Sequence, residues 1–181
     1  MTYSISLGFD KITGEKIKQD IFNLCKKDIG SCILDYNIPP HITLSIFEYE
    51  PGIIDVLKKV VDSSGVFIKS GKVHFSSIGV FHPPVLYYAP IVTNKLIDIN
   101  EKVFFLLKDI NAKFNPYYVP NNWVPHVSLG YNMTNKDLLV AFEYINSVFS
   151  AFDGQYTRLI LSKYDPYGEI YVVDLKSKLR C

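Results

Sequence analysis

Two short segments of the chain share one pattern of residue types, in which a histidine is followed by an aliphatic residue and then by a small hydroxyl residue. The first segment is Pro40-His41-Ile42-Thr43-Leu44 and the second is Pro125-His126-Val127-Ser128-Leu129, nearly half a chain length further on. The repetition predicts a duplicated site on two strands, because the side chains of a strand alternate between two faces. The side chains expected to share a face are His41, Thr43 and Ser45 in the first strand, and His126, Ser128 and Gly130 in the second.

A pair of histidines on matched strands is suited to general acid–base catalysis. The ordinary pKa of histidine, about 6.5, lets one imidazole be neutral while another is protonated near neutral pH. Cleavage of a phosphodiester needs both forms, because a base deprotonates the attacking oxygen while an acid protonates the departing one. The hydroxyls of Thr43 and Ser128 would donate hydrogen bonds to the phosphoryl oxygens. Nothing in either motif requires a bound metal ion.

The elements around each motif follow the same order. Alternating apolar residues predict a strand, apolar residues at helical spacing predict a helix, and the motif strand, a second helix and closing strands follow. The predicted ranges are 2–9, 12–27, the first motif, 51–61, 66–69 and 72–81 in the first half, and 85–92, 93–110, the second motif, 134–145, 155–164 and 169–175 in the second.

This order predicts a single bilobal domain over residues 1–181, with an internal repeat of approximately 1–84 and 85–181. A chain of 181 residues with 48% hydrophobic content can build one substantial core. No linker rich in Gly, Ser or Pro separates the halves, so the segment 81–84 is the expected hinge. The turn residues Asp165-Pro166-Tyr167-Gly168 predict a hairpin between the last two strands.

The charge of the chain argues against a protein that holds a long nucleic acid. Its 19 basic and 18 acidic residues leave a net charge of +1, whereas many phosphate contacts require a strongly basic surface. The ranges 33–50 and 119–134 around the motifs contain no Arg or Lys. A long RNA strand would therefore need basic residues from elsewhere, and the candidates on the predicted closing strands are Lys69, Lys72, Arg158 and Lys163.

The cysteines and the absence of targeting patterns in the sequence predict where in the cell the protein is found. Cys25, Cys32 and Cys181 form an odd set without CxxC spacing, which favours reduced thiols over a disulfide framework or a zinc site. No N-terminal signal pattern and no apolar run of membrane-spanning length is present. We therefore expect a soluble, cytoplasmic protein.

The other histidines and the aromatic residues are mostly expected to be structural. His74 lies in a strand-like run, and His82 precedes two prolines. Most of the tyrosines and phenylalanines are expected in the core. Trp123 and Tyr131, however, flank the second motif, where an aromatic ring could stack on a base.

The motifs resemble those of the 2H phosphoesterase superfamily, which includes the 2′-5′ RNA ligase-like proteins and the cyclic phosphodiesterases. That family is named for two His-x-Thr/Ser motifs, matched here by His41 with Thr43 and by His126 with Ser128. The segment 78–87 is similar to the one that joins the two halves of the family, and 161–171 resembles its closing hairpin. The resemblance covers nearly the whole chain.

The resemblance implies an α+β fold of two lobes, in which two antiparallel sheets face a central cleft and helices lie outside. It implies a metal-independent phosphoesterase without a cofactor, acting on a 2′,3′-cyclic phosphate or a related ribose phosphodiester, and 2′-5′ RNA ligation in some members. The expected substrate is a small nucleotide or an RNA terminus, and the expected protein is a monomer with no obligate protein partner. The predicted site comprises His41 and His126 as catalytic residues, Thr43, Ser128, Ser45, Tyr131 and Trp123 as substrate-binding residues, and no metal.

Two questions stay open at this point. The symmetry of the motifs does not say which histidine is the acid and which is the base. The alternative to an enzyme is a binding module that holds a nucleotide or RNA end in the same cleft without turning it over. A third hypothesis is a structural protein whose histidines belong to the core, in which case their replacement would reduce stability but not activity.

Overall fold

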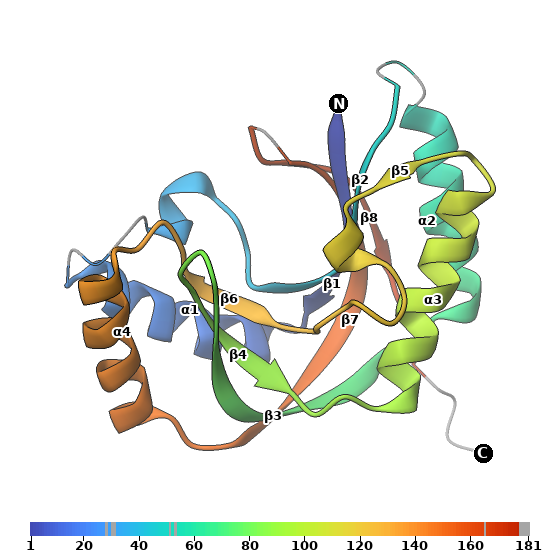
Figure 1. The fold of residues 1–181 in the computed structure, drawn as a ribbon. Helices are drawn as coiled ribbons and strands as arrows, with labels where there is room; N and C mark the ends of the chain where they lie inside the picture. Colours follow the sequence, from blue (N-terminus) through green and yellow to red (C-terminus); the bar gives the residue numbers. More distant parts are fainter. Residues whose placement is uncertain (28, 30–31, 51, 53, 165, 178–181) are drawn as a thin grey trace.

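The computed structural model describes residues 1–177 except 28, 30–31, 51, 53 and 165 (Figure 1). Four α-helices, two 3-10 helices and eight strands appear in the described part, and all the strand pairs are antiparallel. The predicted α+β class is therefore confirmed. The elements are β1 (Thr2–Phe9), α1 (Lys11–Cys25), η1 (Ile33–Tyr36), β2 (His41–Glu48), α2 (Ile54–Phe67), β3 (Gly71–Phe81), β4 (Val85–Pro90), α3 (Asn94–Lys108), β5 (Lys113–Phe114), η2 (Pro116–Tyr118), β6 (Val127–Gly130), α4 (Asn135–Val148), β7 (Phe152–Lys163) and β8 (Gly168–Asp174).

The strands form one hydrogen-bonded sheet that has two parts, called wings here. The first wing contains β5, β2, β1 and β8 with the later part of β7, and the second contains β3, β4 and β6 with the beginning of β7. The strand order is β5-β2-β1-β7-β3-β4-β6, and β8 pairs with β7 outside this order. The long strand β7 joins the wings, because its first residues pair with β3 while the rest pairs with β1 and β8. The two sheets expected from the resemblance are thus continuous with each other. Helices α1 and α4 lie next to the strands β4 and β6, and α2 and α3 lie next to β2 and β8 (Figure 1).

The two wings are not the two halves of the sequence. In the first wing β1, from the first half of the chain, pairs with β7 from the second half. In the second wing β3, from the first half, pairs with β4 from the second. The segment 81–84, expected as a hinge, is instead the turn of the β3–β4 hairpin, in which Phe81 pairs with Val85. The internal repeat itself stays a prediction.

Local sequence explains where the helices begin. The carboxylate of Asp10 accepts a hydrogen bond from Thr13 N at the start of α1, and the hydroxyl of Thr93 accepts one from Leu96 N at the start of α3. Helix α4 begins with a capping box in which Thr134 and Asp137 satisfy each other's backbone N–H groups. These caps confirm the predicted starts of α3 and α4.

One predicted strand is wrong. Residues 66–69 were expected to be extended, but α2 continues to Phe67, and Ile68 N donates a helical hydrogen bond to Ser64 O (2.8 Å). A short apolar run directly after a helical stripe does not distinguish strand from helix by its periodicity. Three residues of the sequence predictions, Pro51 and Ile53 at the start of this helix and Asp165 in the last turn, lie outside the described residues.

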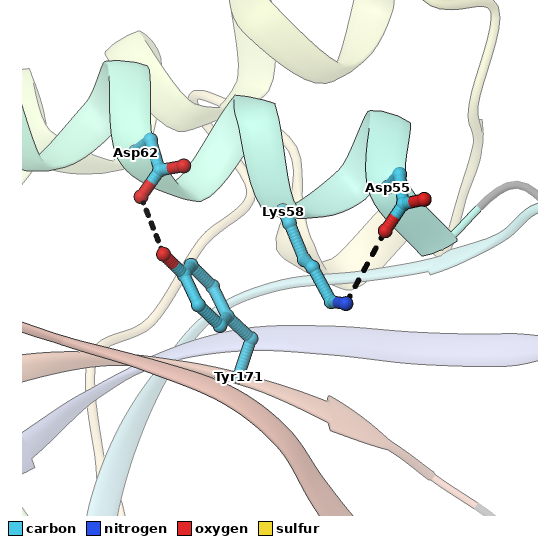
Figure 2. A network of polar contacts seen from close by, with 4 residues as sticks. All are labelled: Asp55, Lys58, Asp62 and Tyr171. Atoms are coloured by element: carbon cyan, nitrogen blue, oxygen red, sulfur yellow. Dashed lines mark hydrogen bonds and ion pairs between the residues drawn. The ribbon is translucent and has the colours of Figure 1, made fainter.

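The helices pack on the outer face of the sheet, which carries the apolar side chains of the strands. The Asn100 side chain of α3 donates to Leu44 O (2.8 Å) in β2, and Tyr88 of β4 donates to Asp20 of α1 (3.0 Å). Helix α2 is tied to β8 by the hydroxyl of Tyr171, which donates to Asp62 at 2.9 Å (Figure 2). The face opposite the helices is called the inner face below. None of the described helices is long and apolar enough to cross a membrane.

The cysteines differ from the sequence prediction. Cys25, at the end of α1, and Cys32, just before η1, form a disulfide with a Cα–Cα distance of 5.2 Å. The expectation of reduced thiols is therefore wrong for this pair, because the fold places the two side chains within bonding distance, which spacing alone does not reveal. Cys181 lies outside the described residues. The cytoplasmic location stays a prediction.

Candidate active site

The first motif histidine is held by the backbone two residues before it. His41 begins β2, and its Nδ1 lies 2.7 Å from the carbonyl oxygen of Pro39. A carbonyl oxygen can only accept a hydrogen bond, so Nδ1 carries the proton of this contact. The other ring nitrogen, Nε2, is then the one available for proton transfer.

The second motif repeats this arrangement. His126 lies one residue before β6, and its Nδ1 is 2.8 Å from the carbonyl oxygen of Val124. The contact again spans two residues and leaves Nε2 available. The duplication seen in the sequence therefore extends to the orientation and tautomer of both imidazole rings.

A β-bulge follows the hydroxyl residue in the first motif strand. Thr43 pairs with Ser6, but the register then shifts, and Ser45 pairs with Ile5, a core residue of the outer face. An extra residue in a strand interrupts the alternation of faces. The bulge turns Ser45 away from His41 and Thr43, so the prediction that these three side chains share a face is wrong for Ser45. The Ser45 side chain is 1% exposed, and its hydroxyl has no hydrogen-bond partner in the described part of the chain.

The second motif strand has a bulge at the matching place. Ser128 pairs with Tyr87, and Gly130 pairs with the core residue Leu86 across the next shift in register. The bulge thus turns Gly130 toward the outer face as it does Ser45, contrary to the predicted alternation. In both strands the histidine and the hydroxyl residue two positions later remain on the inner face.

The hydroxyls of Thr43 and Ser128 are available to a ligand. Thr43 is 8% exposed and Ser128 is half-buried. Neither hydroxyl hydrogen-bonds to a protein group among the described residues. Each could therefore donate to a phosphoryl oxygen placed between the histidines.

Trp123 links the two motifs. Its indole Nε1 donates a hydrogen bond to the carbonyl oxygen of Thr43 (2.8 Å), and its ring packs against the hydrophobic core. The chain that leads into His126 is in this way attached to the first motif strand. The structure thus shows Trp123 in a contact that positions the first motif strand. The stacking of its ring on a base stays a prediction.

The two histidines are close enough to influence each other's charge. Cα positions of β2 and β6 come within 8 Å of each other. Burial lowers the pKa of His41, while its hydrogen bond to Pro39 and the carboxylate of Glu169 act in the opposite direction. Burial also lowers the pKa of His126, the bond to Val124 opposes this, and positive charge on His41 lowers it further.

Aromatic rings surround His126. Its imidazole meets the rings of Phe81 and Tyr87 edge to face, with centroids 4.8 Å and 5.4 Å away, and Tyr118 lies at 6.5 Å. Phe81 and Tyr87 stack on each other at 4.2 Å. These residues belong to the β3–β4 hairpin and to η2, and their role at the site was not predicted, although 78–87 is the segment that resembles the family's joining segment.

The β7–β8 hairpin carries Glu169, whose carboxylate acts on His41. Ser162, a buried residue of β7, donates to the hydroxyl of Tyr167 at 3.4 Å and pairs with Glu169 in β8. Burial raises the pKa of Tyr167, and the neighbouring Glu169 raises it too, whereas Ser162 and Arg158 lower it. Tyr167 and Glu169 were also missed. The one sequence signal for them was the resemblance of 161–171 to the family's closing hairpin.

Tyr131 lies in a group of tyrosines beside the second motif. Its ring centroid is 6.2 Å from that of Tyr36, and burial, a hydrogen bond with Tyr36 and the nearby Tyr164 raise its pKa to about 12. Burial and Tyr164 likewise raise the pKa of Tyr118, the neighbour of His126, to about 12. Tyr164 thus influences both Tyr131 and Tyr118 electrostatically.

Of the four basic candidates, only Arg158 lies level with His41 across the strands of the sheet. Gly8 of β1 pairs with His41 on one side and with Arg158 on the other. Lys69 instead donates to Val66 O, Lys72 lines a small pocket with His74 and Asp153, and Lys163 pairs with Tyr3 at the far end of β7. No group of three or more His, Cys, Asp or Glu side chains within the described residues could hold a metal ion.

An antiparallel α+β fold that brings two His-x-Thr/Ser motifs together on its inner face defines the class of 2H phosphoesterases. The sequence pattern of the 2′-5′ RNA ligase superfamily matches residues 29–168, which contain both motifs. The chain therefore belongs to this superfamily, and the resemblance stated from the motifs is confirmed. No curated protein matches the sequence.

Solved structures share the fold over almost the full length of the chain. Escherichia coli LigT in its apo form has a TM-score of 0.59 at 11% identity, covering 97% of this chain and 98% of LigT. TT0787 of Thermus thermophilus has a TM-score of 0.66 at 9% identity, covering 99% and 100%. LigT complexed with 3′-AMP has a TM-score of 0.61 at 10% identity, covering 96% and 97%. At such identities the likeness shows the fold.

Proposed function

We propose that this protein is a metal-independent phosphoesterase that hydrolyses a 2′,3′-cyclic phosphate or a related ribose phosphodiester. The observation that carries the proposal is the matched state of the two histidines. Both rings use Nδ1 to bind a carbonyl two residues earlier, which leaves both Nε2 atoms for proton transfer. The matched hydroxyls of Thr43 and Ser128 accompany them on the same face.

The proposed reaction is an in-line displacement at phosphorus. The neutral histidine takes a proton from water as the water oxygen bonds to phosphorus. The P–O bond on the opposite side breaks, and the protonated histidine gives its proton to the departing ribose oxygen. Thr43 and Ser128 donate hydrogen bonds to the non-bridging oxygens, where negative charge increases. The product is a phosphomonoester, and the two histidines regain their starting states by exchange with water.

The surroundings of the histidines favour one assignment of roles. Glu169 opposes the lowering of the pKa of His41, whereas positive charge on His41 lowers the pKa of His126. Glu169 favours the protonated form of His41, and the mutual repulsion of two positive imidazoles favours having only one of the pair protonated at a time. We therefore assign His41 as the general acid and His126 as the general base. In 2′-5′ ligation of RNA ends the roles would be the same, because the 5′-hydroxyl of a second RNA end would attack phosphorus in place of water and the ribose 3′-oxygen would depart.

The nature of the ligand is supported by the fold relatives. LigT structures hold 3′-AMP, NADP+ and phosphate. These ligands contain the phosphate, and in two cases the nucleotide, that the present histidine and hydroxyl arrangement would bind. We propose a nucleotide or RNA terminus as the substrate of this chain.

The test is turnover of a panel of 2′,3′-cyclic nucleoside monophosphates in the presence of a chelator. The wild type is expected to form one phosphomonoester isomer, and His41→Ala and His126→Ala are each expected to lose on the order of 10²-fold or more of the activity. A His41→Ala protein with unchanged turnover would refute the mechanism. Tight binding of a product nucleotide without turnover of any cyclic phosphate would instead favour the non-catalytic binding module.

A further inference from the structure

Ser6, in the middle of β1, lies next to Thr43 on the inner face of the sheet. Its neighbours in the strand, Ile5 and Leu7, belong to the hydrophobic core, so the side chain between them faces the other way. The register of β1 and β2 pairs Ser6 with Thr43, and it pairs the residue two positions after Ser6 with His41. Ser6 is therefore the direct cross-strand neighbour of the motif hydroxyl and a diagonal neighbour of the motif histidine.

The Ser6 side chain is buried without a partner. It is 3% exposed, and its hydroxyl makes no hydrogen bond to another described residue. The hydroxyls of Ser45 and Tyr156 also lack a partner in the described part of the chain, but protein atoms enclose them completely. The Ser6 hydroxyl is not enclosed in this way, so it keeps access to the inner face. A buried hydroxyl is costly unless it is hydrogen-bonded, and the side that this hydroxyl faces is the site between the motifs.

Ser6 and Thr43 are close enough to contact one phosphoryl oxygen. Directly opposite residues of an antiparallel pair have Cβ atoms about 5 Å apart on one face. Two hydroxyl oxygens that each donate to the same acceptor over about 2.7 Å can lie up to about 5.4 Å apart. An oxygen atom placed between the two side chains would thus accept a hydrogen bond from both.

The second wing differs at the matching place. The residue that pairs with Ser128 there is Tyr87 of β4. A Cβ atom on Gly79 of β3 would collide with the ring and the hydroxyl of Tyr87. The Tyr87 hydroxyl therefore lies over β3, on the opposite side of β4 from β6 and Ser128. The first wing thus presents two neighbouring hydroxyls to a phosphate, and the second wing presents the Ser128 hydroxyl without such a neighbour.

We propose that Ser6 donates a third hydrogen bond to the reacting phosphate, on the same non-bridging oxygen as Thr43, while Ser128 holds the other non-bridging oxygen. The phosphate is bound asymmetrically in this way, so the protein distinguishes its two non-bridging oxygens. The inference rests on the proposed function, because it adds a contact to the same phosphate. It makes Ser6 a specificity-determining residue that belongs to neither motif.

The test uses the two diastereomers of adenosine 2′,3′-cyclic phosphorothioate, in which sulfur replaces one or the other non-bridging oxygen. Sulfur is a weak hydrogen-bond acceptor. The kcat/KM values of the wild type for the two should differ by at least about tenfold, since sulfur at one position weakens two charge-assisted hydrogen bonds and at the other only one. Ser6→Ala should reduce this ratio severalfold, and it should lower kcat for the unsubstituted 2′,3′-cyclic AMP by about tenfold.

Ser4→Ala is the matched control. Ser4 lies on the same face of the same strand and is 4% exposed, but it pairs with Ile46 and Ser162, which are not motif residues. The control should keep both the ratio and kcat. Both variants should be at least as stable as the wild type in urea, because neither hydroxyl loses a hydrogen-bond partner within the described residues.

Three results would overturn the proposal while leaving the proposed function intact. The first is turnover of both diastereomers by the wild type with equal kcat/KM. The second is a ratio that Ser6→Ala leaves unchanged, and the third is an equal reduction of the ratio by Ser4→Ala and Ser6→Ala.

A binding experiment decides the case in which no cyclic phosphate is turned over and the proposed function fails. The affinity for inorganic phosphate is then measured by calorimetry with the wild type, Ser6→Ala and Ser4→Ala. Binding that Ser6→Ala weakens about tenfold and Ser4→Ala does not weaken supports the Ser6 contact even in a non-catalytic protein. Equal affinity of the wild type and Ser6→Ala, or no binding of phosphate by the wild type, overturns it.

Discussion

The two motif segments have the same backbone geometry and different surroundings. In each, the histidine binds the carbonyl two residues earlier, and a bulge follows the hydroxyl residue. Around His126 the neighbours are the rings of Phe81, Tyr87 and Tyr118. Around His41 they include the carboxylate of Glu169.

Under the proposed mechanism, this difference lets a symmetrical pair perform two different steps. The shared backbone sets the orientation of both rings and so keeps both able to transfer protons through Nε2. The neighbours then decide which ring is more readily protonated. A duplicated sequence is in this way compatible with an acid and a base in one reaction.

The largest effect is expected from the histidines. His41→Ala and His126→Ala should each reduce kcat by about 10²–10⁴-fold. Because the two histidines act on one transition state, kcat of the double variant should be scarcely lower than kcat of the less active single variant. Steady-state turnover of a 2′,3′-cyclic nucleotide measures this. His74→Ala, at an exposed contact with Asp153, is the control and should retain activity. Multiplying losses in the double variant would show that the histidines act independently.

The hydroxyls come next. Thr43→Val and Ser128→Ala should each reduce kcat by about 10²-fold, as removal of one donor to a developing negative charge typically does, while Thr43→Ser should retain most of the activity. Similar losses at the two positions would extend the equivalence of the motifs to phosphate binding. A Thr43→Val enzyme with normal kcat would exclude a phosphate contact from this hydroxyl.

Ser45→Ala is the matched control for the hydroxyls, since Ser45 lies two positions after Thr43 but on the other side of the bulge. It should leave turnover unchanged. It should also raise the free energy of unfolding slightly, by up to about 1 kcal/mol, because it removes a buried hydroxyl without a hydrogen-bond partner. Urea unfolding measures the change, and a large loss of activity would place Ser45 in the site after all.

A smaller effect is expected from the contact that joins the motifs. Trp123→Phe removes the indole N–H and leaves the Thr43 carbonyl without this donor. The free energy of unfolding should fall by about 1 kcal/mol, and kcat should fall severalfold while its pH profile keeps its shape. An altered pH profile would mean that Trp123 acts on the proton transfers themselves and does not only position Thr43.

The smallest effect is a shift along the pH axis, which tests the assignment of roles. The pH profile of kcat/KM should be bell-shaped and centred below pH 6.5, because burial lowers the pKa of both histidines. Glu169 favours protonated His41, so Glu169→Gln should lower the pKa of His41. If His41 is the acid, the basic limb moves to lower pH, and if it is the base, the acidic limb does. Glu143→Gln, on the exposed surface of α4, should move neither limb.

Local patterns predicted much of the fold correctly. The caps at Thr93 and Thr134 and the apolar stripes placed α3 and α4, since these signals depend on residues within a few positions of one another. Prediction failed where the outcome depended on distant partners. Ser45 was misplaced because the bulge arises from pairing with β1. The Cys25–Cys32 disulfide is a local contact over seven positions, and it was missed because spacing alone does not show whether two side chains meet.

The sequence by itself determined the two motifs, the α+β class and the superfamily, because these depend on residue types and on spacings along the chain. Only the tertiary structure decided that each wing of the sheet combines strands from both halves of the chain. It alone placed Arg158 level with His41 across the strands of the sheet and Glu169 near that ring. The physical reason is that strand pairing joins residues far apart in the chain, and that the surroundings of a side chain shift its pKa from the value its type alone would give.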